Sequence, residues 1–235
     1  MGTRVLGILL ALAAAAAAQG KVDIVGKAVD SDGNPIAGAA VATLWGEGRP
    51  HSAVTTDQEG RFTLEVDNRG RPVAILVMDA ERKRGAVSRF SDRSFGKERT
   101  LKLEPLVKVH GKFFCKDLKK KPSWTNVYVN ALPGKIRVAR HSSQEAEFSF
   151  LLPPGEYQLY MYGTDTTTIT REEFVNGDEG TIDLKTVNLP ATNLAKMYGK
   201  KAPAWNVTDT RGVKRNVKLS DYRGKYVLLE FWGYW

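Results

Sequence analysis

Few side chains in this sequence have the types and spacing that catalysis requires. Cys115 is the single cysteine, so the chain can form neither an intramolecular disulfide nor a dithiol pair. Cys115 follows Phe113 and Phe114 in a strand-like stretch, which is typical of a buried, inert thiol. An exposed or intermolecular thiol is the alternative interpretation.

No metal or cofactor site is indicated by the remaining polar residues. The three histidines, His51, His110 and His141, are not at metal-ligand spacing, and surface or strand positions are expected for them. Residues 30–34 look superficially like a calcium loop, but Pro35 stands where that loop needs glycine and the closing glutamate is missing. They are therefore predicted to form a turn. We assign no catalytic, cofactor-binding or metal-binding residue and expect no cofactor.

The net charge of +9 is concentrated in one stretch. Residues 81–121 contain 14 Lys or Arg against five Asp or Glu, mixed with turn residues and without regular aromatic partners. This pattern favours a solvated loop face. Binding to an anionic component of the cell envelope is the alternative, and nucleic acid is not an expected partner.

The amino terminus has the organisation of a secretory signal peptide. Arg4 supplies a positive charge, Val5–Ala18 is apolar, and small residues form an A-x-A site before Gln19. The apolar stretch of about 14 residues is shorter than the roughly 20 that a membrane-spanning helix needs. We therefore expect a signal peptide over residues 1–18 and an exported, periplasmic or extracellular protein, with an uncleaved anchor as the alternative.

From Val22 to Pro190 the chain has short apolar runs between turn residues, which predicts antiparallel β-structure. Phe62–Val66 alternates apolar and polar residues, whereas Val73–Met78 is apolar throughout, as a strand covered on both faces would be. Further strands are expected over Ile24–Val29, Ala39–Leu44, Val107–Phe113, Val127–Leu132, Phe148–Phe150 and Ile182–Val187.

Residues 22–103 contain four segments with a recurring pattern of glycines and apolar positions, Val25–Asp30, Gly33–Ile36, Gly38–Val41 and Thr56–Phe62. Through these segments, residues 22–103 resemble the carboxypeptidase regulatory-like domain. This resemblance implies a small β-sandwich related to the transthyretin and immunoglobulin folds. It also implies an accessory or binding module without catalytic residues.

Residues 105–190 repeat the strand and turn pattern of residues 22–103 more loosely, at a period of about 85 residues. Val107–Phe113 restates the opening strand with its glycine. Leu152–Tyr160 resembles a P-x-G-x-Y hairpin, and Tyr157, Leu159 and Met161 are predicted to share one face. The expected architecture is two tandem sandwiches, with a single larger sandwich as the alternative.

The last segment follows a linker over residues 191–198. A hairpin is expected at Thr210–Gly212, a short helical turn at Leu219–Gly224 and an apolar parallel strand at Tyr226–Phe231. With G-x-x-A-P and L-S-D-Y-R-G-K motifs, residues 199–235 resemble the amino-terminal part of redoxins, the alkyl hydroperoxide reductase/thiol-specific antioxidant and TlpA-like proteins.

That resemblance implies an incomplete thioredoxin-like α/β segment whose C-x-x-C would follow Trp235. Trp232 and Trp235 would then flank the redox cysteines. The implied function is an exported thiol-disulfide oxidoreductase that acts on protein thiols or disulfides and is inactive as this 235-residue chain, because the cysteines are missing. The alternative is a non-enzymatic cell-envelope binding protein that works through its β-sandwich domains.

Overall fold

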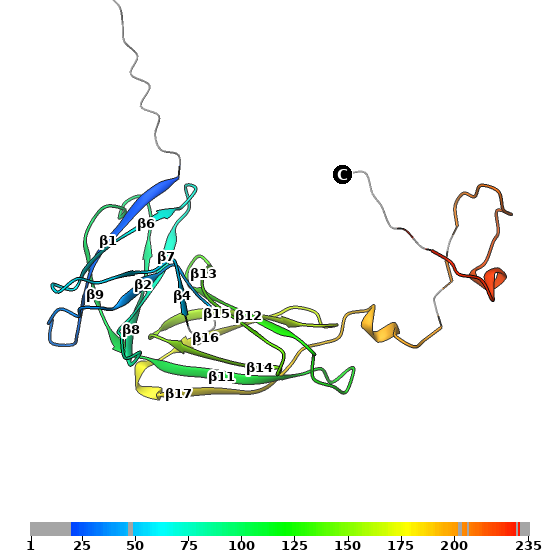
Figure 1. The fold of residues 1–235 in the computed structure, drawn as a ribbon. Helices are drawn as coiled ribbons and strands as arrows, with labels where there is room; N and C mark the ends of the chain where they lie inside the picture. Colours follow the sequence, from blue (N-terminus) through cyan, green and yellow to red (C-terminus); the bar gives the residue numbers. More distant parts are fainter. Residues whose placement is uncertain (1–19, 47–48, 202–203, 206, 229, 231–235) are drawn as a thin grey trace, which may run out of the picture. The chain divides into compact units, whose positions relative to one another are not determined.

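The computed structural model describes residues 20–46, 49–201, 204–205, 207–228 and 230. The described residues form strands and short 3₁₀ turns without an α-helix, which confirms the mainly β class. All strands belong to one compact unit that ends at Thr192, and a second unit begins at Asn193 (Figure 1). The predicted signal peptide, 1–18, lies outside the described residues. In the described part of the chain, no helix has the length and apolarity that a membrane crossing requires.

The first half of the β unit, residues 20–105, forms two sheets. One has the order β6-β1-β9, and the other has the order β10-β8-β7-β2-β5. Buried apolar side chains from both sheets, including Ile24, Phe62, Ile75 and Phe90, form one core cluster. The strands are β1 (Lys21–Val29), β2 (Ala40–Ala42), β5 (Val54–Thr55), β6 (Arg61–Asp67), β7 (Val73–Met78), β8 (Arg84–Phe90), β9 (Arg99–Lys102) and β10 (Glu104–Pro105).

The second half, residues 107–192, also forms two sheets, and they enclose a second core cluster. One has the order β14-β11-β17, and the other contains β16-β15-β12-β13. Tyr157, Leu159 and Met161 are all buried in this cluster, as their alternation predicts. The strands are β11 (Val107–Phe114), β12 (Thr125–Ala131), β13 (Ile136–Ser143), β14 (Glu147–Leu152), β15 (Gly155–Gly163), β16 (Ile169–Val175) and β17 (Thr181–Asn188), with a 3₁₀ turn η1 (Gly177–Glu179).

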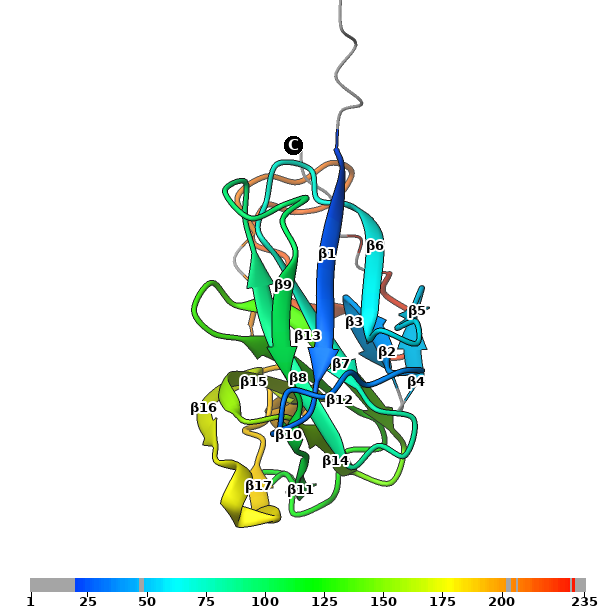
Figure 2. The ribbon, with the colours of Figure 1, turned by 90° about the vertical axis from the view of Figure 1, so that its left-hand side faces the viewer.

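The two halves use the same strand pairing. β1 pairs antiparallel with β6 and parallel with β9, and β11 pairs in the same way with β14 and β17 (Figure 2). In each first strand a glycine lies opposite a phenylalanine, Gly26 opposite Phe62 and Gly111 opposite Phe148. A Cβ atom would lie 2.5 Å from the ring in the first pair and 2.9 Å in the second. The glycines are therefore needed for the close approach of each ring to the backbone.

The hairpin of β3 (Leu44–Gly46) and β4 (Arg49–His51) belongs to the first half in sequence but extends the six-stranded sheet of the second half. Trp45 pairs with Ala139 and Gly46 with Arg140, both in parallel register. The Trp45 indole is buried in the second core cluster, and its Nε1 donates to the carbonyl of Leu76 at 3.4 Å. The two halves are thus joined through a shared sheet.

β7 is covered on both faces, as its apolar run predicts. Ile75 and Val77 belong to the first core cluster, whereas Ala74, Leu76 and Met78 belong to the second. Because neighbouring residues of a strand point to opposite faces, β7 and its sheet lie between the two cores.

Most predicted strands are confirmed within a residue or two, but the region around Ala39–Leu44 differs. It splits at Thr43 into β2 and β3, which join different sheets. Among the strands not predicted are β8, β13 and β16, which contain several basic or acidic residues. β16 is an edge strand with mostly exposed side chains, so its sequence lacks the apolar alternation of a half-buried strand.

Two local predictions are confirmed. Cys115 is a buried free thiol with 1% of its surface exposed. The Asp30 carboxylate accepts hydrogen bonds from the backbone N–H groups of Asp32 and Asn34 and from the Asn34 side chain, which is the bonding of a turn. The Asn34 side chain, with these backbone bonds, lowers the pKa of Asp30.

The expectation of a thioredoxin-like segment over 199–235 is wrong for the described residues. They contain the 3₁₀ turn η3 (Leu219–Tyr222), which lies within the predicted helical turn, but no strand, and the 3₁₀ turn η2 (Ala195–Met197) precedes them. Tyr226 and Leu228, within the predicted strand, are almost fully exposed. A strand needs backbone partners on a neighbouring strand, and none forms in the described part of this segment. Trp232 and Trp235 lie outside the described residues.

Candidate binding surface

An aromatic surface lies on the outer side of β12 and β15. Tyr128 and Tyr160 are directly opposite each other in the ladder, and Tyr162 follows on β15. Their ring centroids are 6.0–6.2 Å apart. The Trp124 ring is 5.8 Å from Tyr162 in an edge-on arrangement. We call these four residues, Trp124, Tyr128, Tyr160 and Tyr162, the aromatic face.

The strand alternation places these rings outward. Val127, Val129, Leu159 and Met161 point into the core and are completely buried. The residues between them face the other way, and Trp124 and Tyr160 keep more than a third of their surface exposed. A cluster of large rings on a regular sheet is rigid and partly wetted, which is the character of a recognition surface rather than of a core.

Polar side chains order the rings. The Asn126 amide donates to the Tyr162 hydroxyl at 2.9 Å, and the Ser142 hydroxyl donates to the Asn126 carbonyl at 3.1 Å. The hydrogen bond from Tyr162 lowers the pKa of Tyr128. The Asn126 bond alone would lower the pKa of Tyr162, but the bond to Tyr128, burial and the neighbouring phenols together raise it. Tyr128 and Tyr162 therefore belong to one hydrogen-bonded network with Asn126 and Ser142.

A cation borders the aromatic face. The guanidinium carbon of Arg137 lies 3.5 Å from the centroid of the Tyr128 ring, a cation–π contact. Arg137 also lines a pocket of about 530 Å³ between β13 and the turn that joins β6 to β7. The pocket and the aromatic face are therefore adjacent at Arg137.

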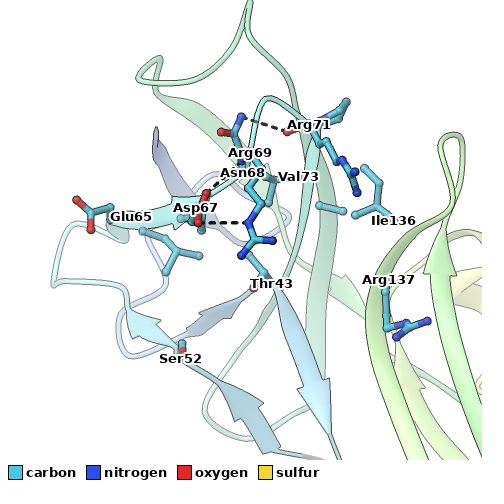
Figure 3. Close-up of a pocket in the computed structure, with 14 residues that line it drawn as sticks. Thr43, Ser52, Glu65, Asp67, Asn68, Arg69, Arg71, Val73, Ile136 and Arg137 are labelled. Atoms are coloured by element: carbon cyan, nitrogen blue, oxygen red, sulfur yellow. Dashed lines mark hydrogen bonds and ion pairs between the residues drawn. The ribbon is translucent and has the colours of Figure 1, made fainter. Parts of the chain in front are cut away.

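The pocket is lined by residues from both halves, with charged and amide side chains beside apolar ones such as Val73 and Ile136. Figure 3 shows Arg69 and Arg71 on the β6–β7 turn and Arg137 on β13 across the opening. Arg69 forms an ion pair with Asp67 at 3.5 Å, and the Asn68 amide donates to the Arg71 carbonyl at 3.1 Å. Such a site can bind polar groups, but it holds no histidine or cysteine that could act as a nucleophile or base.

The histidines are separated by the fold. His51 lies on β4, the His110 Nδ1 is 3.8 Å from the Asp183 carboxylate, and the His141 ring is 5.9 Å from the Phe150 ring. Among the described residues, no three His, Cys, Asp or Glu side chains gather as metal ligands would.

The sequence carries a signal for the aromatic face in the outward residues of two predicted strands. From the sequence, roles are assigned only to the inward residues of these strands. Tyrosines at alternate positions, as in Tyr160 and Tyr162, face outward whenever Leu159 and Met161 face inward. Tyr128 lies beside them because β12 pairs with β15 in a particular register, and this pairing could not be predicted from the sequence.

The basic stretch over residues 81–121, for which a solvated loop face is the expectation and binding to an anionic envelope component the alternative, lies in β8, β9, β11 and the loops around them. These three strands belong to three different sheets. Several of the cations are neutralised locally. Lys83 pairs with Glu81, Arg84 with Asp79, Lys112 with Glu147 and Lys120 with Asp165.

Comparisons with known proteins identify no family. No family model and no curated protein matches the chain. Among solved structures, a streptococcal ancillary pilin matches at 12% identity and a TM-score of 0.34, covering 74% of this chain and 63% of that one. The Bacillus anthracis TIE protein matches at 15% identity and a TM-score of 0.33, covering 73% of this chain and 34% of that one. The shaft pilin SpaA of Lactobacillus rhamnosus GG matches at 6% identity and a TM-score of 0.31, with coverages of 74% and 98%.

TM-scores this low do not establish a common fold, so nothing is transferred from these proteins. Both expected family memberships, carboxypeptidase regulatory-like domain and redoxin, are wrong, because no model of either family matches. The thiol-disulfide oxidoreductase or antioxidant function is wrong as well. The thioredoxin-like elements on which it depended do not form in the described residues. The expectation of protein thiols or disulfides as partners is wrong for the same reason.

Proposed function

We propose that this chain is a non-enzymatic binding protein of the cell envelope that acts through its β domains. The aromatic face is the observation that carries the proposal. Trp124, Tyr128, Tyr160 and Tyr162 form a partly exposed surface whose rings are fixed by strand register and by Asn126. Large rigid rings give contact area at little cost in conformational entropy, and their hydroxyl groups add hydrogen bonds.

We further propose that residues 22–103 and 105–190 are two tandem sandwiches and that residues 191–198 link them to the last segment. The two separate core clusters and the repeated pairing of β1 and β11 support this division. The β3–β4 hairpin of the first sandwich pairs with β13 of the second, so the two sandwiches share one sheet. Export rests on the signal-peptide pattern of residues 1–18.

Binding by this surface would use a preorganised site. The three tyrosines lie on paired central strands, β12 and β15, so little ordering is required when a ligand binds. A ligand that covers the rings would contact Tyr128 and Tyr160 at the centre and Arg137 at one side. Central, desolvated aromatic contacts supply most of the affinity of such interfaces.

The test is cosedimentation of the purified protein with the envelope fraction of the cells that produce it. Replacing both central rings, Tyr128→Ala with Tyr160→Ala, should weaken binding by roughly tenfold or more. Phe174→Ala is the matched control, since Phe174 is an exposed aromatic on edge strand β16 outside the aromatic face. Unchanged binding by the double variant, or an equal loss in the Phe174 variant, would refute the proposal.

A further inference from the structure

One row of paired residues crosses the outer side of the six-stranded sheet that contains the aromatic face. Tyr160 pairs with Tyr128, and Tyr128 pairs with Arg140. Arg140 pairs in turn with Gly46, and Gly46 pairs with Arg49 at the edge of the sheet. Residues paired across neighbouring strands point to the same face, so the two tyrosines and the two arginines share one side. The row spans about 19 Å, since neighbouring strands lie roughly 4.8 Å apart.

The glycine leaves a notch in this row. Arg49 and Arg140 flank Gly46 on its two sides. His51, two residues after Arg49, points to the same side of β4. A Cβ atom at Gly46 would lie 2.7 Å from the His51 Nε2 and 3.3 Å from the Arg140 Nε, so both side chains lean over the glycine. With Pro50, these residues line a pocket of about 530 Å³, a volume typical of small-molecule sites. We call this pocket the Gly46 notch.

The Gly46 notch is cationic. Arg49, His51 and Arg140 are exposed, and the ion pairs that form between described residues involve none of them. The described residues that line the notch include no carboxylate. Guanidinium groups bind a carboxylate or a phosphate through two parallel hydrogen bonds, which a single ammonium group cannot match. The notch is therefore suited to an anionic group.

We propose that the outer face of this sheet binds an acidic polysaccharide, with sugar rings on Tyr128 and Tyr160 and an anionic group in the Gly46 notch. This inference rests on the proposed function, because it names the ligand of the aromatic face. The apolar face of a sugar ring packs on a tyrosine ring, and the hydroxyl groups of both stay hydrogen-bonded. A carboxylate or a phosphate on a neighbouring sugar then meets Arg140 and Arg49 further along the same row.

A single-stranded nucleic acid also combines rings with anionic groups, and it binds to aromatic and basic side chains in a similar way. The sugar chain is favoured because the signal-peptide pattern of residues 1–18 predicts export from the compartment that contains nucleic acids. A neutral polysaccharide would leave the guanidinium groups of the notch without a partner. The ligand is therefore expected to be both a sugar chain and an anion.

The experiment is isothermal titration calorimetry with oligogalacturonate, which carries a carboxylate on each sugar, and with its methyl ester, which has the same chain without the charge. The acid should bind roughly four- to twentyfold more tightly, because each of the two exposed guanidinium groups contributes roughly two- to fivefold. This preference should decrease as the salt concentration rises, since exposed charges are screened. Dextran phosphate compared with dextran tests a phosphate in the same way. A preference for the acidic chain in either pair supports the proposal and identifies the anion.

A pair of double variants tests the charge of the notch. Arg49→Gln with Arg140→Gln should make the acidic and the neutral chain bind equally. The matched control is Arg93→Gln with Lys102→Gln, which removes the same charge from exposed positions in the first half, on the β8–β9 loop and on β9. The control should leave the preference unchanged, because neither residue belongs to the six-stranded sheet.

A third variant tests the shape of the notch while every cation is retained. The backbone of Gly46 lies outside the left-handed region, so alanine is accommodated once the His51 ring moves. The new Cβ occupies the space over which His51 and Arg140 lean, so Gly46→Ala should reduce the preference for the acidic chain by roughly twofold or more. Thermal unfolding confirms that the variant is folded.

The proposal is overturned if neither acidic chain binds, if neither pair shows a preference, or if the control double variant loses the preference equally. It is also overturned if an oligothymidylate of similar length binds more tightly than both acidic sugars. Loss of envelope cosedimentation in Tyr128→Ala with Tyr160→Ala, but not in Arg49→Gln with Arg140→Gln, would refute the acidic ligand and leave the proposed function intact.

Discussion

The two halves of the β unit have the same strand order but use the outer face of one sheet differently. β8-β7-β2 in the first half corresponds to β16-β15-β12 in the second. On β7 the outward residues, including Leu76 and Met78, are apolar and are covered by the second core. On β15 the outward residues include Tyr160 and Tyr162, which remain partly exposed.

The difference teaches which residues make a permanent contact and which leave a surface for another molecule. Aliphatic side chains gain most from complete removal from water, so the outer face of β7 is part of the core. Tyrosine combines an apolar ring with a hydroxyl and is stable at an open surface. Residues shared by both halves, such as Gly26 and Gly111, serve the fold, and those that differ are the candidates for function.

The largest difference is expected when the same polar side chain is placed on each of the two faces. Leu76→Gln should destabilise the protein by about 3–5 kcal/mol, because it removes a fully buried side chain and buries an amide without an assigned partner. Tyr160→Gln on the open face should cost about 1 kcal/mol or less. Chemical denaturation of both variants measures the two values. Equal losses would contradict the distinction between a covered and an open face.

The paired glycines give the next largest effect. A Cβ at Gly26 would lie 2.5 Å from the Phe62 ring and 3.0 Å from the Arg99 carbonyl, whereas at Gly111 the distances to Phe148 and the Lys185 carbonyl are 2.9 and 3.2 Å. We expect Gly26→Ala to cost about 2–3 kcal/mol and Gly111→Ala about 1–2 kcal/mol.

Urea unfolding curves of the two glycine variants give this order directly. The control for steric conflict is a double variant, Gly26→Ala with Phe62→Leu. The leucine shortens the side chain that opposes the new Cβ. The interpretation fails if neither alanine lowers the unfolding midpoint, or if the order of the two is reversed.

The turns of the two halves should differ in their pH dependence. The Asp79 carboxylate bonds the backbone N–H groups of Lys83 and Arg84 before β8, whereas the Thr166 hydroxyl closes the turn before β16. Burial alone would raise the pKa of Asp79, but the backbone hydrogen bonds of Arg84 and Lys83 and the Arg84 guanidinium outweigh it and lower the pKa.

Because the pKa of Asp79 is lowered by folding, its stabilising contribution is present above the ordinary aspartate value near 4 and is lost as the pH falls through the folded-state pKa. Asp79→Asn should therefore lower stability at pH 7 by about 1 kcal/mol and reduce the decline of Tm between pH 5 and pH 2. Thr166→Val should leave the slope of Tm against pH unchanged. A steeper acid decline in the Asp79 variant would show that another carboxylate dominates.

The smallest effect concerns the phenols of the aromatic face. Since the hydrogen bond from Tyr162 stabilises the Tyr128 phenolate, Tyr162→Phe should raise the pKa of Tyr128 toward the ordinary value of a tyrosine. Ultraviolet absorbance during an alkaline titration measures this change, and Tyr160→Phe is the control because Tyr160 does not hydrogen-bond to Tyr128. A Tyr128 pKa that stays constant in Tyr162→Phe would exclude the proposed network.

The last segment shows how far sequence motifs alone can mislead. The order of its motifs resembles that of a known family more closely than any motif of the β unit does. The described part of residues 199–235 nevertheless contains no strand. The side chain of Trp205 bonds the Val217 carbonyl at 3.0 Å and packs on Tyr222, so its order is local. An apolar run becomes a strand only when another strand supplies backbone partners.

The sequence by itself determined the mainly β class, the inward faces of β6 and β15 and the burial of Cys115. These follow from alternation and turn residues, which act over a few positions of the chain. Tertiary structure alone decided which face of β7 the second half covers, where the β3–β4 hairpin pairs, and how Tyr128 meets Tyr160. Those outcomes depend on strand register and sheet edges between residues far apart in the chain, and local sequence periodicity does not encode them.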